Sequence, residues 1–184
     1  MTLPALINTV IEHLDGAGVP YMVTGSVASS YHGEPRATRD LDVVIDPDGA
    51  SLASLVGRLG GAGLYVDREA ALVALATRGQ FNAIDRSSGW KVDFVIRRDR
   101  PFSREEFGRR LPAELLGTPA WIVTPEDAIL VKLEWALASG SDRQLADASA
   151  LLRIGRDTLD FGYLDRWADE LGLREAWSRL RDEA

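Results

Sequence analysis

The spacing of apolar residues changes along the chain, and this change limits the possible fold more than any other feature. In the first hundred residues, patterns with helical spacing, such as the one over 3–14, alternate with short apolar runs bounded by turn residues. The runs are 21–24, 41–45, 64–66, 81–85 and 90–96. Such runs are typical of strands, whereas the pattern after residue 125 is helical to the end. This order predicts an α/β (α+β) fold, with a mixed β-sheet flanked by helices and a C-terminal helical bundle.

Two of the runs give the sheet its mixed character. The polar connection 86–89, which ends in glycine, joins 81–85 to 90–96, so we expect these runs to pair as an antiparallel hairpin. The short run 64–66 is a candidate edge strand. The segment 68–77 is ambiguous.

The second half of the chain opens with a strong helix signal. Thr124 is a good capping residue, and Pro125 suits the first helical position. Just before it, 121–123 is a candidate last strand. We place the domain boundary in the arginine-rich segment upstream, which divides the chain into a core over 1–100 and a mostly helical region over 101–184.

Composition excludes several classes of protein. The chain has 184 residues, enough for one compact domain with a helical appendage, and it has no cysteine for disulfides, thiolate metal sites or nucleophiles. No apolar run approaches the ~20 residues of a membrane-spanning helix. The first residues also lack the features of a signal peptide, so we expect a cytoplasmic protein without membrane contact.

The balance of charge is acidic, with one local exception. A net charge of -7 opposes general binding of nucleic acids. The segment 97–110 holds six arginines against three acids, and is either an anion-binding patch or a solvated, salt-bridged loop. Among 21 basic residues only Lys91 and Lys132 are lysines. Either the two lysines remain by chance, or their positions need a compact, mobile charge that arginine does not provide.

Two carboxylates stand at the start of a predicted strand. Alternation along the strand places Asp40 and Asp42 on one face and Leu41 on the other. Adjacent carboxylates repel unless solvent or a cation separates them, and Mg²⁺ prefers oxygen ligands of this kind. The pair therefore predicts a magnesium site, although an exposed strand end also explains it.

A third carboxylate strengthens this prediction. Asp93 lies between Val92 and Phe94 in the run 90–96, where a charge has no structural reason to be. If this strand neighbours the one with Asp40 and Asp42, three acids converge. Such a set suits two metal ions about 4 Å apart in a displacement at phosphorus. The alternative is an Asp93 that faces solvent.

A glycine turn follows the first predicted strand. Gly25 and Ser26 stand between the strand and a helix, where backbone N–H groups and the positive end of the helix dipole favour phosphate. Gly25 allows close approach of the backbone, and the Ser26 hydroxyl can donate a hydrogen bond. Other phosphate-binding motifs of kinases and dinucleotide enzymes are missing. Of the two histidines, His13 is expected on a helix surface and His32 near this turn.

These residues together resemble the DNA polymerase β-like nucleotidyltransferase superfamily: Gly25-Ser26, thirteen intervening residues, Asp40-Leu41-Asp42, and Asp93 on a later strand. Within that superfamily, 23–45 is similar to the bacterial AbiEii and MenT-like toxin nucleotidyltransferases and their uncharacterised relatives. The similarity extends to 129–135 and 141–152, and so covers nearly the whole chain. It implies the nucleotidyltransferase fold.

The resemblance also implies roles for these residues. Gly25 and Ser26 would bind the phosphates of a nucleoside triphosphate. Asp40, Asp42 and Asp93 would hold Mg²⁺, with two ions expected, and Asp93 would help to activate an acceptor hydroxyl.

Further site residues come from the same resemblance. It implies that Lys132 and Asp147 line the catalytic site and that Lys132 also contacts the nucleotide. Otherwise, Lys132 is a surface residue, and Asp147 pairs with Arg143. Because the fork of an arginine matches the geometry of phosphate, Arg36, Arg39 or the arginine-rich segment would bind the triphosphate or the acceptor.

Three functions fit this pattern. We favour an enzyme that transfers a nucleotide to RNA, such as tRNA, or to a protein, as a toxin with an antitoxin partner. The alternatives are a small-molecule nucleotidyltransferase of the aminoglycoside-modifying type and an inactive nucleotide-binding partner protein. Retention of all three carboxylates argues against the inactive protein, because the acids would otherwise crowd like charges.

Overall fold

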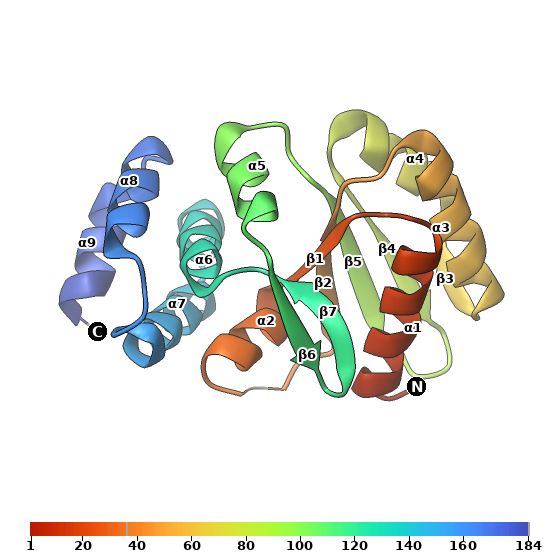
Figure 1. The fold of residues 1–184 in the computed structure, drawn as a ribbon, viewed down its shortest axis with the longest axis horizontal. Helices are drawn as coiled ribbons and strands as arrows, with labels where there is room; N and C mark the ends of the chain where they lie inside the picture. The colour runs from red at the N-terminus through yellow and green to blue at the C-terminus, as the bar shows by residue number, and fades with distance from the viewer. Residues whose placement is uncertain (36, 184) are drawn as a thin grey trace. The chain divides into compact units, whose positions relative to one another are not determined.

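The computed structural model describes residues 1–35 and 37–183, and these form one seven-stranded sheet and nine helices (Figure 1). The strands are β1 Tyr21–Thr24, β2 Asp40–Ile45, β3 Leu64–Val66, β4 Gln80–Asp85, β5 Lys91–Ile96, β6 Leu111–Leu115 and β7 Thr118–Ile122. The helices are α1 Leu3–Gly16, α2 Gly25–His32, α3 Gly49–Gly61, α4 Arg68–Thr77, α5 Pro101–Gly108, α6 Pro125–Ser139, α7 Asp142–Gly155, α8 Phe161–Glu170 and α9 Arg174–Glu183. The predicted α/β fold with a helical C-terminal part is confirmed.

The sheet is mixed, as predicted. Its strand order is β3-β4-β5-β2-β1-β7-β6, with β2 parallel to β5 and β1 parallel to β7, and the other neighbours antiparallel. The β4–β5 hairpin forms where the polar connection predicted it, and β3 lies at an edge. Because β2 and β5 are separated in sequence by α3, β3, α4 and β4, their pairing brings together distant parts of the chain.

Alternating burial orients the two central strands. Leu41, Val43 and Ile45 on β2 are buried opposite Val92, Phe94 and Ile96 on β5, their register partners. Since successive side chains of a strand point to opposite faces, the residues between them lie on the other face. There they are only half-buried. The apolar pattern therefore places the acids of both strands on one face of the sheet.

Helices α1, α3 and α4 belong to the same part of the chain as the sheet, and each packs against one of its strands. In Figure 1, α1, α3 and α4 accompany the sheet, and they contact β7, β3 and β4 respectively. Caps define where they begin: the hydroxyl of Thr2 and the carboxylates of Asp48 and Asp67 accept hydrogen bonds from the first backbone N–H groups. The apolar side of α1 is completely buried, from Leu6 to Leu14.

The chain divides into two compact units. One comprises residues 1–27 and 37–122 and contains the whole sheet, and the other comprises 28–35 and 123–183. The division at residue 100 that the sequence suggested stays a prediction. In the structure, α5, β6 and β7 belong to the unit with the sheet.

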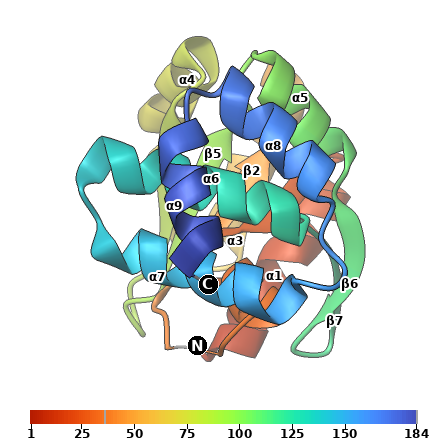
Figure 2. The ribbon, with the colours of Figure 1, turned by 90° about the vertical axis from the view of Figure 1, so that its left-hand side faces the viewer.

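The second unit is helical and has its own core. Figure 2 shows its helices α6 to α9, of which α6 contacts α7 and α8, and α9 also contacts α7 and α8. Thr124 caps α6, as predicted, by accepting a hydrogen bond from the N–H of Asp127. The completely buried Asp127 carboxylate accepts hydrogen bonds from the Thr124 hydroxyl, at 2.7 Å, and from the Tyr163 hydroxyl, at 2.5 Å.

In three segments the structure adds to, or differs from, what the sequence suggested. The ambiguous segment 68–77 is helix α4, and the arginine-rich segment contains α5. The single strand expected at 121–123 is a hairpin of β6 and β7, joined by Leu116 and Gly117, both with positive φ. In residues 1–35 and 37–183, no helix combines the length and apolar character needed to cross a membrane.

Candidate active site

The three predicted metal ligands come from β2 and β5, and the register of these strands brings them to one place. Asp42 is the register partner of Asp93, and Asp40 is the partner of Lys91. All four lie on the half-buried face, at the beginning of both strands. Asp93 therefore does not point away from the pair on β2, and the side chain of Asp93 is 21% exposed.

The glycine turn lies next to the same carboxylates. Thr24, the last residue of β1, is the register partner of Asp42, and α2 begins directly after it at Gly25. A β-carbon built on Gly25 would lie 1.9 Å from Oδ2 of Asp42, and the φ of Gly25 is +64°. Both observations require glycine here. The N-terminus of α2, with the nearly buried Ser26, thus lies beside the carboxylates, where β1 ends and β2 begins.

A lysine stands among the acids. The ammonium of Lys91 lies 2.8 Å from Oδ2 of Asp93 and 3.7 Å from Oδ1 of Asp40. The hydrogen bond to Asp93 is the main reason that the pKa of Lys91 is raised, and the charges of Asp93, Asp40 and Asp42 add to it, while burial opposes them. Sequence reasoning missed this contact, although the rarity of lysine had marked the position.

The donor atoms suit Mg²⁺, but their present arrangement is that of an ion-pair cluster. The three carboxylates are hard oxygen donors. Mg²⁺ is usually bound by such carboxylates together with the phosphates of a substrate. Among residues 1–35 and 37–183, no three acidic, histidine or cysteine side chains lie together closely enough to hold a metal ion as they stand. The Lys91 ammonium instead neutralises part of the charge of Asp40 and Asp93.

Lys132 and Asp147 belong to the helical unit, where the structure pairs them with each other. The Lys132 ammonium donates to Oδ2 of Asp147 at 2.7 Å and to the side-chain oxygen of Gln144 at 3.1 Å. Both side chains are largely buried, 6% and 11% exposed. Lys132 is therefore no surface residue, and its partners on α7 include Asp147 and Gln144. Asp147 also lines a hollow of about 150 Å³ together with Ser29 and Glu34.

The predicted anion-binding arginines differ in their surroundings. Arg39, directly before β2, is exposed, and its carbonyl accepts a 3.4 Å hydrogen bond from the N–H of Lys91. Arg36 lies outside the described residues.

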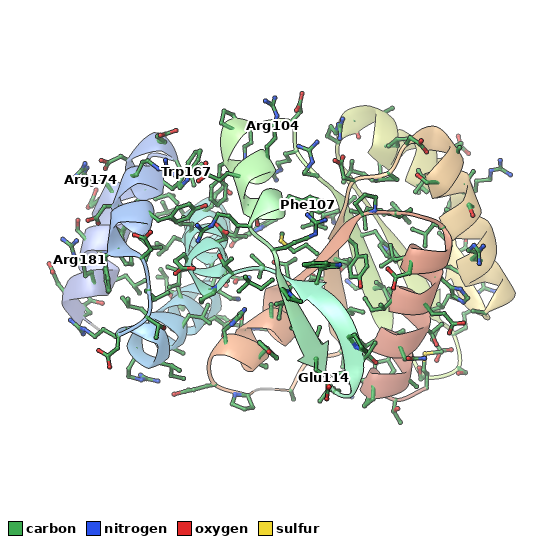
Figure 3. All side chains as sticks on the ribbon, viewed as in Figure 1. Arg104, Phe107, Glu114, Trp167, Arg174 and Arg181 are labelled. Carbon is green, nitrogen blue, oxygen red and sulfur yellow. The ribbon has the colours of Figure 1, made fainter. Side chains whose placement is uncertain are left out.

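Arginines of the segment 97–110 pair with acids of their own unit. Arg97 pairs with Asp46 at 2.9 Å, and Arg104 pairs with Asp99. Figure 3 shows Arg104 projecting outward from α5. These contacts agree with the salt-bridged alternative for this segment.

His32 has a structural contact that the sequence did not indicate. It is the last residue of α2, and Nε2 lies 2.7 Å from the carbonyl oxygen of Val123. Burial lowers the pKa of the ring, and this effect outweighs the hydrogen bond and the charge of Glu126, which raise it. Its neutral form therefore prevails at neutral pH, with Nε2–H donating to the carbonyl.

Comparison with solved structures identifies the fold. The chain is similar to the antibiotic-resistance factor ANT(2'')-Ia, with a TM-score of 0.62 and 15% identity over 98% of this chain and 93% of that one. It is similar to a nucleotidyltransferase-like protein from Paracoccidioides brasiliensis, with a TM-score of 0.59 and 16% identity over 97% and 91% of the two chains.

A third structure, the lincosamide antibiotic adenylyltransferase LnuA bound to lincomycin, matches with a TM-score of 0.57 and 12% identity over 84% of this chain and 98% of that one. No family model matches the chain, and no curated protein matches it in sequence. The chain thus has the nucleotidyltransferase fold, as the resemblance implied. The narrower likeness to AbiEii and MenT-like toxins stays a prediction.

Proposed function

We propose that this protein is a magnesium-dependent nucleotidyltransferase that transfers a nucleoside monophosphate from a nucleoside triphosphate to a hydroxyl of a small-molecule acceptor. One observation carries the proposal. Asp42 and Asp93 are register partners on the shared face of β2 and β5, and Gly25, at the start of α2, has room only for a hydrogen atom beside the Asp42 carboxylate. The turn that would bind the triphosphate and a set of hard oxygen donors are thus neighbours.

The roles of the residues follow from their positions. Asp40, Asp42 and Asp93 would hold Mg²⁺, which neutralises charge on the transferring phosphate. The backbone of Gly25 and the hydroxyl of Ser26 would position the phosphates at the N-terminus of α2. The acceptor oxygen attacks the α-phosphorus, the bond to the β-phosphate oxygen breaks, and pyrophosphate leaves. Asp93 would accept the proton of the acceptor hydroxyl as the oxygen attacks.

The nature of the acceptor is suggested by charge and by the solved structures. A net charge of -7 attracts cationic molecules and repels a polyanion such as RNA. One of the ANT(2'')-Ia structures is a complex with adenylyl-2''-tobramycin. We therefore favour a small acceptor that carries hydroxyl and amino groups.

A second function is favoured by the pair in the helical unit. The resemblance to toxin nucleotidyltransferases assigns a lysine and an aspartate to the site, and Lys132 and Asp147 form a buried ion pair at those positions. A buried pair of this kind is retained at a cost in desolvation, which suggests a role beyond stability. In this case RNA or a protein would be the acceptor, with an antitoxin as partner.

One experiment separates these functions. The protein is incubated with Mg²⁺ and each of the four α-³²P-labelled ribonucleoside triphosphates, in the presence of aminoglycosides, lincosamides, total RNA or cell protein. We expect label on a cationic small molecule, lost in Asp42→Asn and Asp93→Asn and retained in Asp99→Asn, whose exposed carboxylate pairs with the surface residue Arg104. Label on RNA or protein would establish the second function. Nucleotide binding without transfer to any acceptor would contradict both.

A further inference from the structure

The cluster on β2 and β5 contains one positive charge that the proposed reaction does not use. The Lys91 ammonium contacts Asp93 at 2.8 Å and Asp40 at 3.7 Å, and its side chain is 37% exposed. Alternation and register place it on the same face as all three acids. The Lys91 ammonium thus lies between carboxylates that would bind a divalent cation.

We propose that Lys91 is an internal counter-ion that replaces the divalent cation in the metal-free protein, and that the cation enters by displacing the Lys91 ammonium. This inference rests on the proposed function, because it takes Asp40, Asp42 and Asp93 as the metal ligands. The three carboxylates carry three negative charges and Lys91 one positive charge. An ammonium and a divalent cation repel each other, so the two compete for the same oxygen of Asp93.

The chemistry of lysine suits this task. Its ammonium is a compact point charge on a flexible stem, so the side chain can leave a carboxylate without disturbing the strand. The fork of an arginine would bind a carboxylate through two parallel hydrogen bonds and would be harder to displace. Nineteen of the 21 basic residues are arginines, yet this position is a lysine.

Displacement links the metal to the nucleotide. Without a nucleotide, the departing ammonium loses its contacts with Asp93 and Asp40. A bound triphosphate offers it a new anionic partner, since the N-terminus of α2 begins next to Asp42. Lys91 therefore weakens binding of the cation alone and favours entry of the cation together with the triphosphate.

The first test measures Mn²⁺ affinity without nucleotide, by electron paramagnetic resonance of free Mn²⁺. We expect Lys91→Gln to bind Mn²⁺ about tenfold more tightly than the wild type, because a unit charge a few ångströms from the site is removed. Lys91→Arg keeps the charge and should stay weak. Arg86→Gln is the matched control: it removes one positive charge from the β4–β5 connection, where Arg86 lies 4.1 Å above the ring of Tyr65. Its Mn²⁺ affinity should change less than about twofold.

The second test observes Lys91 in the wild-type protein and uses a variant only to assign its signal. The chain has two lysines, so a spectrum of ¹³Cε-labelled lysine contains two signals, and Lys91→Arg identifies the one from Lys91. Saturation with Mg²⁺ and a non-hydrolysable nucleoside triphosphate should move the Lys91 signal. Equal Mn²⁺ affinity of the wild type and Lys91→Gln, or a Lys91 signal that stays in place while Mg²⁺ binds, would overturn the counter-ion role and leave the site intact. Absence of metal binding in every variant, with or without nucleotide, would overturn the proposed function itself.

Discussion

Replacing Gly25 by alanine tests the link between the glycine turn and the carboxylates. The new β-carbon would lie 1.9 Å from Oδ2 of Asp42, and the backbone there has a φ of +64°. Left-handed backbone costs an alanine about 1 kcal/mol, and pushing the Asp42 carboxylate off its rotamer costs about 1 kcal/mol more. We therefore expect Gly25→Ala to lower the free energy of unfolding by about 2 kcal/mol. Because Asp42 would be displaced, Mn²⁺ affinity should fall at least about tenfold.

Gly18→Ala is the matched control for this substitution. Gly18 has a φ of +66°, but a β-carbon on it would have no neighbour within 4 Å. Urea denaturation should therefore show a loss of about 1 kcal/mol in Gly18→Ala, with Mn²⁺ binding and nucleotide transfer as in the wild type. Wild-type Mn²⁺ affinity in Gly25→Ala, or an equal loss of affinity in Gly18→Ala, would refute the reasoning.

Three further substitutions test contacts in the helical unit, each by urea denaturation. Tyr163→Phe removes a hydroxyl that donates to the buried carboxylate of Asp127, so unfolding should become easier by about 2 kcal/mol. Lys132→Met leaves Asp147 without its lysine partner and should cost about 3 kcal/mol; restoration of stability by Lys132→Arg would support the charge as the cause. The folded-state pKa of His32 lies below 6.5, so its contribution to stability is complete above pH 6.5 and declines as the pH falls toward the folded-state value. The stability difference between the wild type and His32→Gln should therefore shrink or reverse between pH 7.5 and 5.5, and a difference independent of pH would contradict this.

The elements that carry the acids could be predicted because their side chains alternate. Leu41, Val43 and Ile45 mark β2 as a strand with one buried face, and the same pattern marks β5. This period is enough to place Asp40 and Asp42 together on the other face. Register between β2 and β5 could not be predicted in this way, because it depends on how the intervening helices and strands pack.

Elsewhere, local signals were weak for physical reasons. Strand β6 was missed because it contains Pro112 and ends at a turn with Leu116 at a φ of 50°, where glycine or asparagine is usual. Proline is tolerated there because β6 lies at the edge of the sheet. Helix α4 was ambiguous because it buries only two small residues, Ala71 and Ala74.

The ion pairs could not be predicted from the sequence for a different reason. Lys132 and Asp147 lie on separate helices, so no spacing within one helix indicates their contact. Lys91 and Asp93 are two residues apart on one strand, which predicts a shared face, but the sequence alone does not predict an ammonium between the acids of two strands. Such contacts depend on the order of the strands in the sheet and on the packing of the helices.

The most direct measurement is a crystal structure of the protein with Mn²⁺ and a non-hydrolysable nucleoside triphosphate, with anomalous scattering used to locate the ion. Our account predicts an anomalous peak bound by the carboxylates of Asp42 and Asp93, with the triphosphate at Gly25 and the Lys91 ammonium moved away from Asp93. An ordered triphosphate whose Mn²⁺ touches neither carboxylate would contradict it.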